Sequence, residues 1–174
     1  MLDPVSELFA GGRPAALDAG ETLFLTGDRV ASIFLVTAGR VDLVRHTVSG
    51  VRMVLQRVPP GRVLAEASAY SGTYHCDGTA NAASEVLGIA VAEFRDRLGR
   101  DAAASRAWAA SLAHDLQNAR MAAEIRTLRT VAARLDAWLA AGRSLPTRGR
   151  WQDVAEELGI SREALYRELA MRRA

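Results

Sequence analysis

A short stretch near the end of the chain, residues 151–170, constrains the fold most strongly; it reads WQDVAEELGISREALYRELA. Apolar residues recur at helical spacing on both sides of Gly159, and glycine readily takes the left-handed conformation that ends a helix. Ser161 follows where its hydroxyl can cap a second helix. The small side chain of Ala155 allows the two helices to cross closely. These features predict a helix-turn-helix, two short helices joined by a tight turn.

The second of these helices leaves a polar face, made of Arg162, Glu163, Tyr166 and Arg167, opposite its apolar residues. Arginine pairs bidentately with guanine, and glutamate accepts a hydrogen bond from cytosine. A helix N-terminus that carries Ser161 also suits a phosphate group. An ordinary helical hairpin with a solvated charged face has the same spacing, so DNA binding and simple packing both remain open from this stretch alone.

The charge balance adds little to the case for nucleic acid. The chain has 174 residues, enough for one or two domains, and a formal net charge of +2. All 22 basic residues are arginine, and residues 141–174 hold seven of them against five acids, so the excess lies in the tail. The single cysteine excludes an internal disulfide and suits a reducing compartment. Without an apolar run of spanning length or a signal peptide, we expect a cytoplasmic protein and no membrane.

The first half of the chain has the pattern of a small β-structure. A short helix is expected over residues 4–10, and then apolar and polar residues alternate in short runs separated by glycines. The runs are residues 22–26, 32–37, 40–45, 51–58 and 86–91. Repeated short strands with turn signals predict a barrel or roll.

The second half has a helical pattern instead. A short helix is expected over residues 93–98, and residues 101–126 form one long helix without proline or glycine. Its apolar positions approximate a heptad seam, which favours a dimer, although a helix lying on its own roll has the same pattern. These positions are Trp108, Leu112, Leu116, Ala119 and Ala123. A further helix over residues 127–141 and a polar loop over residues 142–149 lead to the helix-turn-helix.

The order of roll, long helix and helix-turn-helix resembles the Crp/Fnr family, that of the catabolite activator protein and the fumarate–nitrate reductase regulator. The matching segments are AGETLFLTGD at 19–28, VTAGRVDLVR at 36–45, PGRVLAEASAY at 60–70 and GISREALYR at 159–167. The resemblance implies an α+β fold with a cyclic-nucleotide-binding-like β-roll in residues 1–100. A dimerisation helix in residues 101–126 and an all-α DNA-binding domain in residues 127–174 follow.

The resemblance also implies a homodimeric transcription regulator that binds double-stranded DNA, with RNA polymerase as a further partner. The expected DNA-binding residues are Ser161, Arg162, Glu163, Tyr166, Arg167, Arg148 and Arg150. Of these, Arg148 and Arg150 precede the motif and are expected at phosphates, which position a protein without specifying sequence.

Two departures from the family pattern leave an alternative open. The family usually continues into a β wing, which we expect to be missing here, and Glu168 falls where the family commonly has an aliphatic residue. The alternative is a ligand-binding or protein-interaction module whose tail no longer reads DNA.

The stretch that holds cyclic nucleotides in the family has changed. Glu66, followed by Ala67 and Ser68, matches the acid that binds the ribose, but ten positions on, where the family has a phosphate-binding arginine, stands Cys76, followed by Asp77. A phosphate buried without a cation is strongly disfavoured. Arg120 on the long helix falls near the position that faces adenine. We therefore expect a roll that does not respond to cyclic AMP and that binds another small effector or none.

The pair His75–Cys76 has the chemistry of a haem or metal ligand. Neighbouring residues of a strand face opposite sides, however, so we expect Cys76 to pack as a small hydrophobe and His75 to bond a loop. No metal site, cofactor or catalytic residue is expected, and the protein is not expected to be an enzyme.

Overall fold

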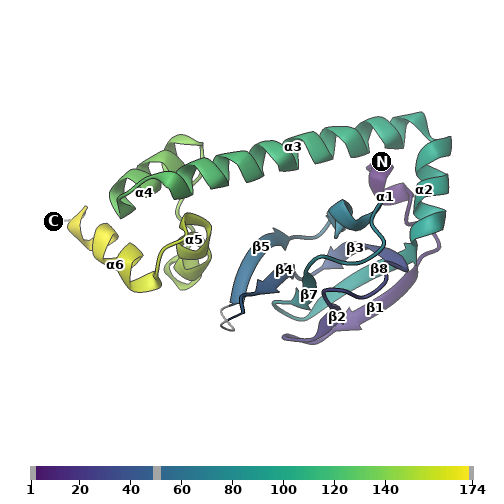
Figure 1. Ribbon diagram of the computed structural model, residues 1–174, viewed down its shortest axis with the longest axis horizontal. Helices are drawn as coiled ribbons and strands as arrows, with labels where there is room; N and C mark the ends of the chain where they lie inside the picture. The colour runs from purple at the N-terminus through teal and green to yellow at the C-terminus, as the bar shows by residue number, and fades with distance from the viewer. Residues whose placement is uncertain (1–2, 49–51, 173–174) are drawn as a thin grey trace. The chain divides into compact units, whose positions relative to one another are not determined.

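The computed structural model describes residues 3–48 and 52–172, with the backbone but not the side chain of Arg148. The chain divides into two compact units, with the boundary after Leu112 inside one long helix. Figure 1 shows the order of the elements along the chain.

The first unit is a roll of two four-stranded antiparallel sheets. One sheet has the order β1-β8-β3-β6 and the other β2-β7-β4-β5. The strands are β1 (Arg13–Leu17), β2 (Thr22–Phe24), β3 (Ser32–Ala38), β4 (Val41–His46), β5 (Arg52–Val58), β6 (Val63–Leu64), β7 (Asp77–Ala80) and β8 (Ser84–Ala90). Apart from the consecutive strands β4 and β5, neighbours in both sheets are far apart in sequence, so long-range pairing holds most of the roll.

The turn between β3 and β4 shows why glycine is required in the roll. Gly39 has φ +75°, a conformation that side chains rarely adopt, and a Cβ there would lie 2.3 Å from the carbonyl oxygen of Ala83. The neighbouring Arg40 N–H donates to the Ser84 hydroxyl, and this hydroxyl donates back to the Arg40 carbonyl oxygen. The turn is therefore fastened to the start of β8.

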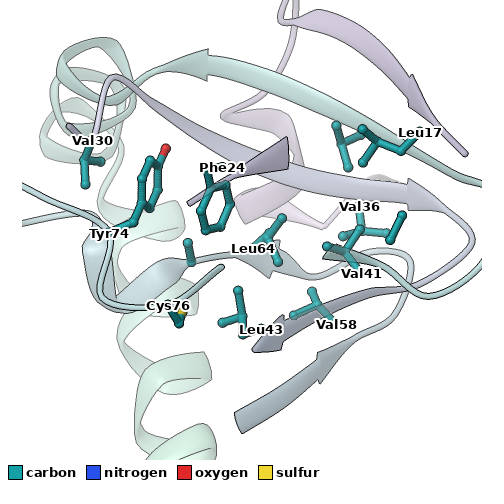
Figure 2. Packing of buried hydrophobic residues seen from close by; sticks show 13 residues of the cluster. Leu17, Phe24, Val30, Val36, Val41, Leu43, Val58, Leu64, Tyr74 and Cys76 are labelled. Carbon is teal, nitrogen blue, oxygen red and sulfur yellow. The ribbon is translucent and has the colours of Figure 1, made fainter. Parts of the chain in front are cut away.

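Apolar side chains from both sheets meet inside the roll, as Figure 2 shows. Phe24 stacks on Tyr74 with ring centroids 4.0 Å apart, and Val36, Val41 and Leu64 are fully buried beside them. The Tyr74 hydroxyl donates to the Ser32 carbonyl oxygen at 2.6 Å, so its polar end is satisfied. This cluster is the core to which Cys76 belongs.

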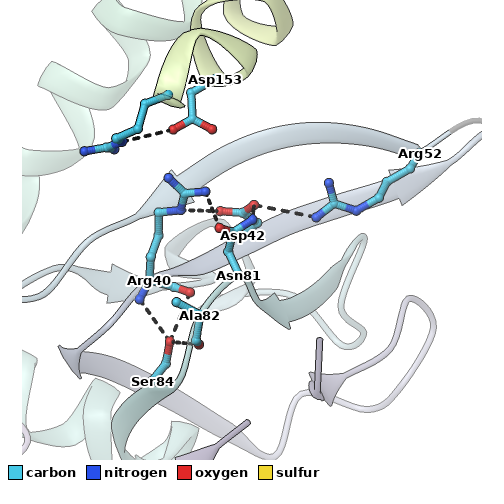
Figure 3. Close-up of polar contacts among 8 residues, drawn as sticks. Arg40, Asp42, Arg52, Asn81, Ala82, Ser84 and Asp153 are labelled. Atoms are coloured by element: carbon cyan, nitrogen blue, oxygen red, sulfur yellow. Dashed lines mark hydrogen bonds and ion pairs between the residues drawn. The ribbon is translucent and has the colours of Figure 1, made fainter. Parts of the chain in front are cut away.

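A polar network closes the outside of the second sheet (Figure 3). Asp42 is only 1% exposed, and its carboxylate receives a hydrogen bond from Asn81 at 3.0 Å. Arg40 and Arg52 form ion pairs with it at 3.3 and 3.6 Å. Because an unpaired buried charge is costly, these partners are what allow a carboxylate at this position.

Helices pack on the other sheet to form a second cluster in the first unit. They are α1 (Pro4–Glu7), α2 (Val91–Arg100) and the first part of α3 (Ala102–Thr127). Phe94 lies between Phe9 and Trp108, with the Trp108 ring 5.1 Å away in an edge-on arrangement. Trp108, which the sequence placed in a heptad seam, is therefore a core residue of its own roll.

The second unit is a small helical domain. Its helices after α3 are α4 (Val131–Ala140), α5 (Trp151–Leu158) and α6 (Arg162–Met171), and the short 3₁₀ turn η2 (Arg148–Arg150) comes before α5. The other 3₁₀ turn, η1 (Glu66–Ser68), belongs to the roll. Ile125, Leu135, Leu158 and Leu165 are almost completely buried against one another. The amphipathic faces predicted for these helices thus form one core.

The predicted fold class, a β-roll, a long helix and a small helical C-terminal region, is confirmed. Five predicted strands appear with small shifts of their ends, whereas β1, β6 and β7 were missed. The strands β6 and β7 are only two and four residues long, too short for alternation to show. Among the described helices, none combines the length and hydropathy needed to cross a membrane.

Candidate functional site

The turn between α5 and α6 has the geometry that the sequence predicts. Gly159 takes the left-handed conformation with φ 65°, and the Ile160 N–H donates back to the Ala155 carbonyl oxygen at 3.0 Å. The Ser161 hydroxyl accepts a hydrogen bond from the Ala164 N–H at 3.1 Å and so caps α6. Two helices thus meet at a tight, well-defined turn.

The helix α6 has one buried and one exposed face. Leu165 and Leu169 are buried in the core of the unit, while Arg162, Glu163 and Arg167 are exposed. At the helix N-terminus, the backbone N–H of Glu163 and the Ser161 side chain hold the pKa of the Glu163 carboxyl below its usual value. The exposed face therefore carries two guanidinium groups and one ionised carboxylate.

Tyr166 is partly buried and lies at the boundary between the buried and the exposed face of α6. Its ring packs against Trp151 with centroids 4.9 Å apart, and the Arg162 guanidinium lies over it at 5.2 Å. The same guanidinium donates to the Tyr166 hydroxyl at 3.3 Å. Tyr166 therefore supports Arg162 as well as closing the edge of the core.

Glu168, which departs from the family pattern, is 8% exposed and is held by a residue that the sequence analysis missed. The Arg172 guanidinium pairs with Glu168 at 2.6 Å, with Asp136 of α4 at 2.6 Å, and donates to the Ala132 carbonyl oxygen at 3.1 Å. The end of α6 is thereby tied to α4. The spacing of four residues between Glu168 and Arg172 could have predicted their ion pair from the sequence. The contact of Arg172 with Asp136 arises only in the folded unit.

Two arginines, Arg148 and Arg150, come directly before α5. Arg150 is exposed and forms an ion pair with Asp153 at 3.4 Å. The side chain of Arg148 lies outside the described residues, although its backbone belongs to η2.

In the roll, the residues expected to bind a ligand lie at the turn η1 and on β7. Ala65 precedes η1 with φ 59°, a conformation unusual for a residue other than glycine. Glu66 is half-buried, Ala67 is exposed, and Ser68 is completely buried. Arg120 is exposed on α3, in the other unit.

Cys76, which the resemblance aligns with the family's phosphate-binding arginine, has a side chain that is 1% exposed and points among Leu43 and the other core residues (Figure 2). Burial raises the pKa of its thiol to about 11, and this outweighs the opposite effect of Arg45. The thiol is thus neutral and inert at physiological pH. The expectation that Cys76 packs as a small hydrophobe is confirmed.

Arg45 is the second residue that the sequence analysis missed. It belongs to β4, and its guanidinium donates to the His75 carbonyl oxygen at 2.6 Å from Nη2 and 3.2 Å from Nε. A cation therefore lies beside the stretch that has no arginine of its own. Nothing local in the sequence links residues 45 and 75, because strand pairing brings them together.

An open pocket of about 530 Å³ lies beside Arg45 and is lined by Thr26, Arg45, His46, His75 and Asp77. The Asp77 carboxylate accepts hydrogen bonds of 2.7 Å from the Thr26 N–H and hydroxyl, and it lies 3.4 Å from His46 Nδ1. Partial burial raises the pKa of Asp77, but the bonds from Thr26 and the proximity of His46 outweigh it, so the net pKa is lowered.

His75 is exposed, and its Nδ1 lies 3.3 Å from the Ser68 hydroxyl. Since Cys76 faces the core, the two side chains do not face one metal. Within residues 3–48 and 52–172, no group of three or more histidine, cysteine or acidic side chains could hold a metal ion.

Comparison with known proteins agrees with this architecture. The family model of the cyclic nucleotide-binding domain matches residues 15–101. The N-terminal domain of a transcriptional regulator from Streptomyces coelicolor A3(2) is 26% identical, with a TM-score of 0.52, over 67% of this chain and 82% of that one. The comparison with curated proteins gives no match.

Two longer structures share the fold of nearly the whole chain. The c-di-GMP-responsive global regulator CLP of Xanthomonas campestris is 19% identical, with a TM-score of 0.75, over 98% of this chain and 90% of that one. The Thermus thermophilus catabolite activator protein is 24% identical, with a TM-score of 0.59, over 98% and 83%.

Proposed function

The chain belongs to the cyclic nucleotide-binding domain family, and from this membership we propose that it is a DNA-binding transcription regulator rather than an enzyme. It works in the cytoplasm as a homodimer, reads double-stranded DNA with α6, and has RNA polymerase as a further partner. Transcriptional regulators among its structural relatives support this role.

The observation that carries the proposal is the exposed face of α6. Arg162, Glu163 and Arg167 project from a capped helix whose opposite face is fixed in a core by Leu165 and Leu169. Arginine and glutamate are the side chains that read guanine and cytosine in the major groove, and the rigid helix keeps them at constant spacing. Ser161 at the N-terminus of α6, with Arg150 before α5, supplies contacts of the kind that phosphates accept.

The proposed dimer forms through α3. Beyond the part that packs on the roll, α3 exposes Leu116, which is 51% exposed, on the same face as the exposed Ala119 and Ala123. Large apolar side chains next to small ones suit close packing of two helices. In a dimer of the kind that the resemblance implies, the two copies of α6 would enter major grooves about one DNA turn, roughly 34 Å, apart.

The proposed regulator does not respond to cyclic AMP. A cyclic nucleotide bound as in the family needs a cation where this chain has the buried, uncharged Cys76. The next residue, Asp77, is ionised, because hydrogen bonds from Thr26 and the nearby His46 favour its charged form. A phosphate placed at the Cys76 side chain would enter the apolar core of the roll and would lose its hydration without gaining a counter-charge there.

The test is binding of the purified protein to DNA from upstream of its own gene, measured at two salt concentrations with and without cyclic AMP. We expect specific binding that weakens steeply with salt and does not change with cyclic AMP, because phosphate contacts release counterions. Arg167→Ala should weaken binding to the specific site about tenfold or more, as expected for loss of a base contact. Arg13→Ala, which removes an exposed arginine of the roll, is the control with the same charge change.

Two results would contradict the proposal. Equal loss in Arg167→Ala and Arg13→Ala would mean that α6 does not read the bases. Absence of binding to specific and random DNA at low salt would favour a ligand-binding or interaction module instead.

A further inference from the structure

The pocket beside β4 has a composition that the proposed function does not use. Its lining comes from three separate stretches: Thr26 after β2, Arg45 and His46 at the end of β4, and His75 and Asp77 at the start of β7. Its volume of about 530 Å³ lies in the range of small-molecule sites, roughly 300–1,000 Å³. Among the described residues that line it, His75 and Asp77 belong to the stretch in which a ligand was expected, whereas Thr26, Arg45 and His46 do not.

The acidic residue of the pocket is already engaged. Both carboxylate oxygens of Asp77 have partners among the residues that line the pocket. Oδ1 accepts two hydrogen bonds from Thr26, and Oδ2 faces His46 Nδ1. The Thr26 hydroxyl is the donor in one of these bonds and is used up by it. Neither Asp77 nor Thr26 is therefore the group that a ligand would meet first.

The remaining lining groups are nitrogen donors. Arg45 is held in place by two hydrogen bonds to the His75 carbonyl oxygen, which use Nε and Nη2 and fix its fork at the pocket. His46 contacts Asp77 through Nδ1, and His75 contacts Ser68 through Nδ1, so each ring has its Nε2 on the other side. Such a set, one fixed guanidinium and two imidazoles, complements an anion.

We propose that this pocket binds a small anion carrying a phosphate or carboxylate group, with Arg45 as the principal ligand-binding residue and His46 and His75 beside it. The site takes its cation, Arg45, from β4, because residues 63–94 contain no arginine. The ligand meets the roll at an open surface. This inference does not depend on DNA binding, because it concerns the roll alone.

The test is calorimetric titration of the full-length protein with inorganic phosphate and, separately, with succinate, at constant ionic strength. We expect saturable binding of at least one probe, weakened about tenfold or more in Arg45→Gln, because a charge-assisted contact is lost. Arg13→Gln, which removes an exposed arginine of β1, should bind as the unchanged protein does. The tighter probe then identifies the acidic group of the ligand.

A second variant separates binding from folding. Arg45→Gln loses hydrogen bonds to the His75 backbone, whereas His75→Ala keeps the carbonyl oxygen that Arg45 contacts. His75→Ala should therefore retain the melting temperature and still weaken binding by a few fold, as for a neutral hydrogen bond. Equal affinities of Arg45→Gln and Arg13→Gln, or failure of both probes to saturate, would overturn the proposal whatever the outcome of the DNA experiment.

Discussion

The two units of this protein organise their polar residues in different ways. In the helical unit, the residues proposed to contact DNA lie within one stretch, from Arg150 to Arg167, and each is placed by its own helix or cap. In the roll, the pocket joins Thr26, Arg45 and His75, which only strand pairing brings together. A local site tolerates change elsewhere in the unit, whereas a site built from several strands depends on the whole sheet.

A buried acid in each unit repeats this contrast. Glu168 is paired with Arg172, four residues away on the same helical path. Asp42 is held by Arg40 and also by Arg52 and Asn81, which belong to other strands or turns. Substitutions in the two units should therefore differ in how far their effects extend through the structure.

The largest losses in the free energy of unfolding should come from core leucine substitutions and should be similar in the two units. Leu64 of the roll and Leu165 of α6 are both fully buried. Leu64→Ala and Leu165→Ala should each lower the free energy of unfolding by about 2–5 kcal/mol, because each leaves a cavity. Urea denaturation measures this, with Leu25→Ala at a half-exposed position as control. A much smaller loss for Leu165→Ala would show that the helical unit has no rigid core.

Substitution of Asp42, the buried acid of the roll, should give the next largest loss in the free energy of unfolding. Asp42→Asn removes a charge that two arginines face, and it should cost about 2 kcal/mol, because the arginines lose their compensation. Glu85→Gln, on an exposed position of β8, is the matched control for urea denaturation. If both variants were equally stable, the network around Asp42 would contribute nothing.

The acid of the helical unit should have a smaller effect. Glu168→Gln keeps the size of the side chain but weakens the pairing with Arg172, and we expect a loss of about 1 kcal/mol in the free energy of unfolding. Because α6 would be held less firmly, affinity for the specific DNA site should also fall, with the salt dependence unchanged. A changed salt dependence would instead assign a phosphate contact to this region. Glu124→Gln, exposed on α3, serves as control.

The smallest effect concerns reactivity. Burial raises the pKa of Cys76 to about 11, so the native thiol should resist alkylation at pH 8 and react readily after unfolding. Because the folded state holds the thiol proton more tightly, its contribution to stability is complete below about pH 9 and is lost as the pH rises towards 11. Mass spectrometry of the alkylated protein measures the first effect, and fast native labelling would contradict the burial of Cys76.

Much of the architecture follows from local patterns in the sequence. The left-handed Gly159 and the cap at Ser161 are needed wherever two short helices meet at such a turn, and so the sequence predicted them. The exposed arginines of α6 follow from helical periodicity once the buried leucines are known. In the roll, alternation of apolar and polar residues in several of the longer strands likewise predicted them.

Tertiary structure alone decided the rest. The sequence shows Cys76 where a cation is expected, but not that Arg45 approaches the same loop from another strand. It offers two interpretations of Trp108, and only packing against Phe94 places this ring in the core of the roll. The sequence shows Glu168 as a departure from the family pattern, and only the fold links Glu168 through Arg172 to Asp136. Local periodicity determines which face of an element is buried, whereas the partners of a polar side chain depend on long-range pairing that no short stretch encodes.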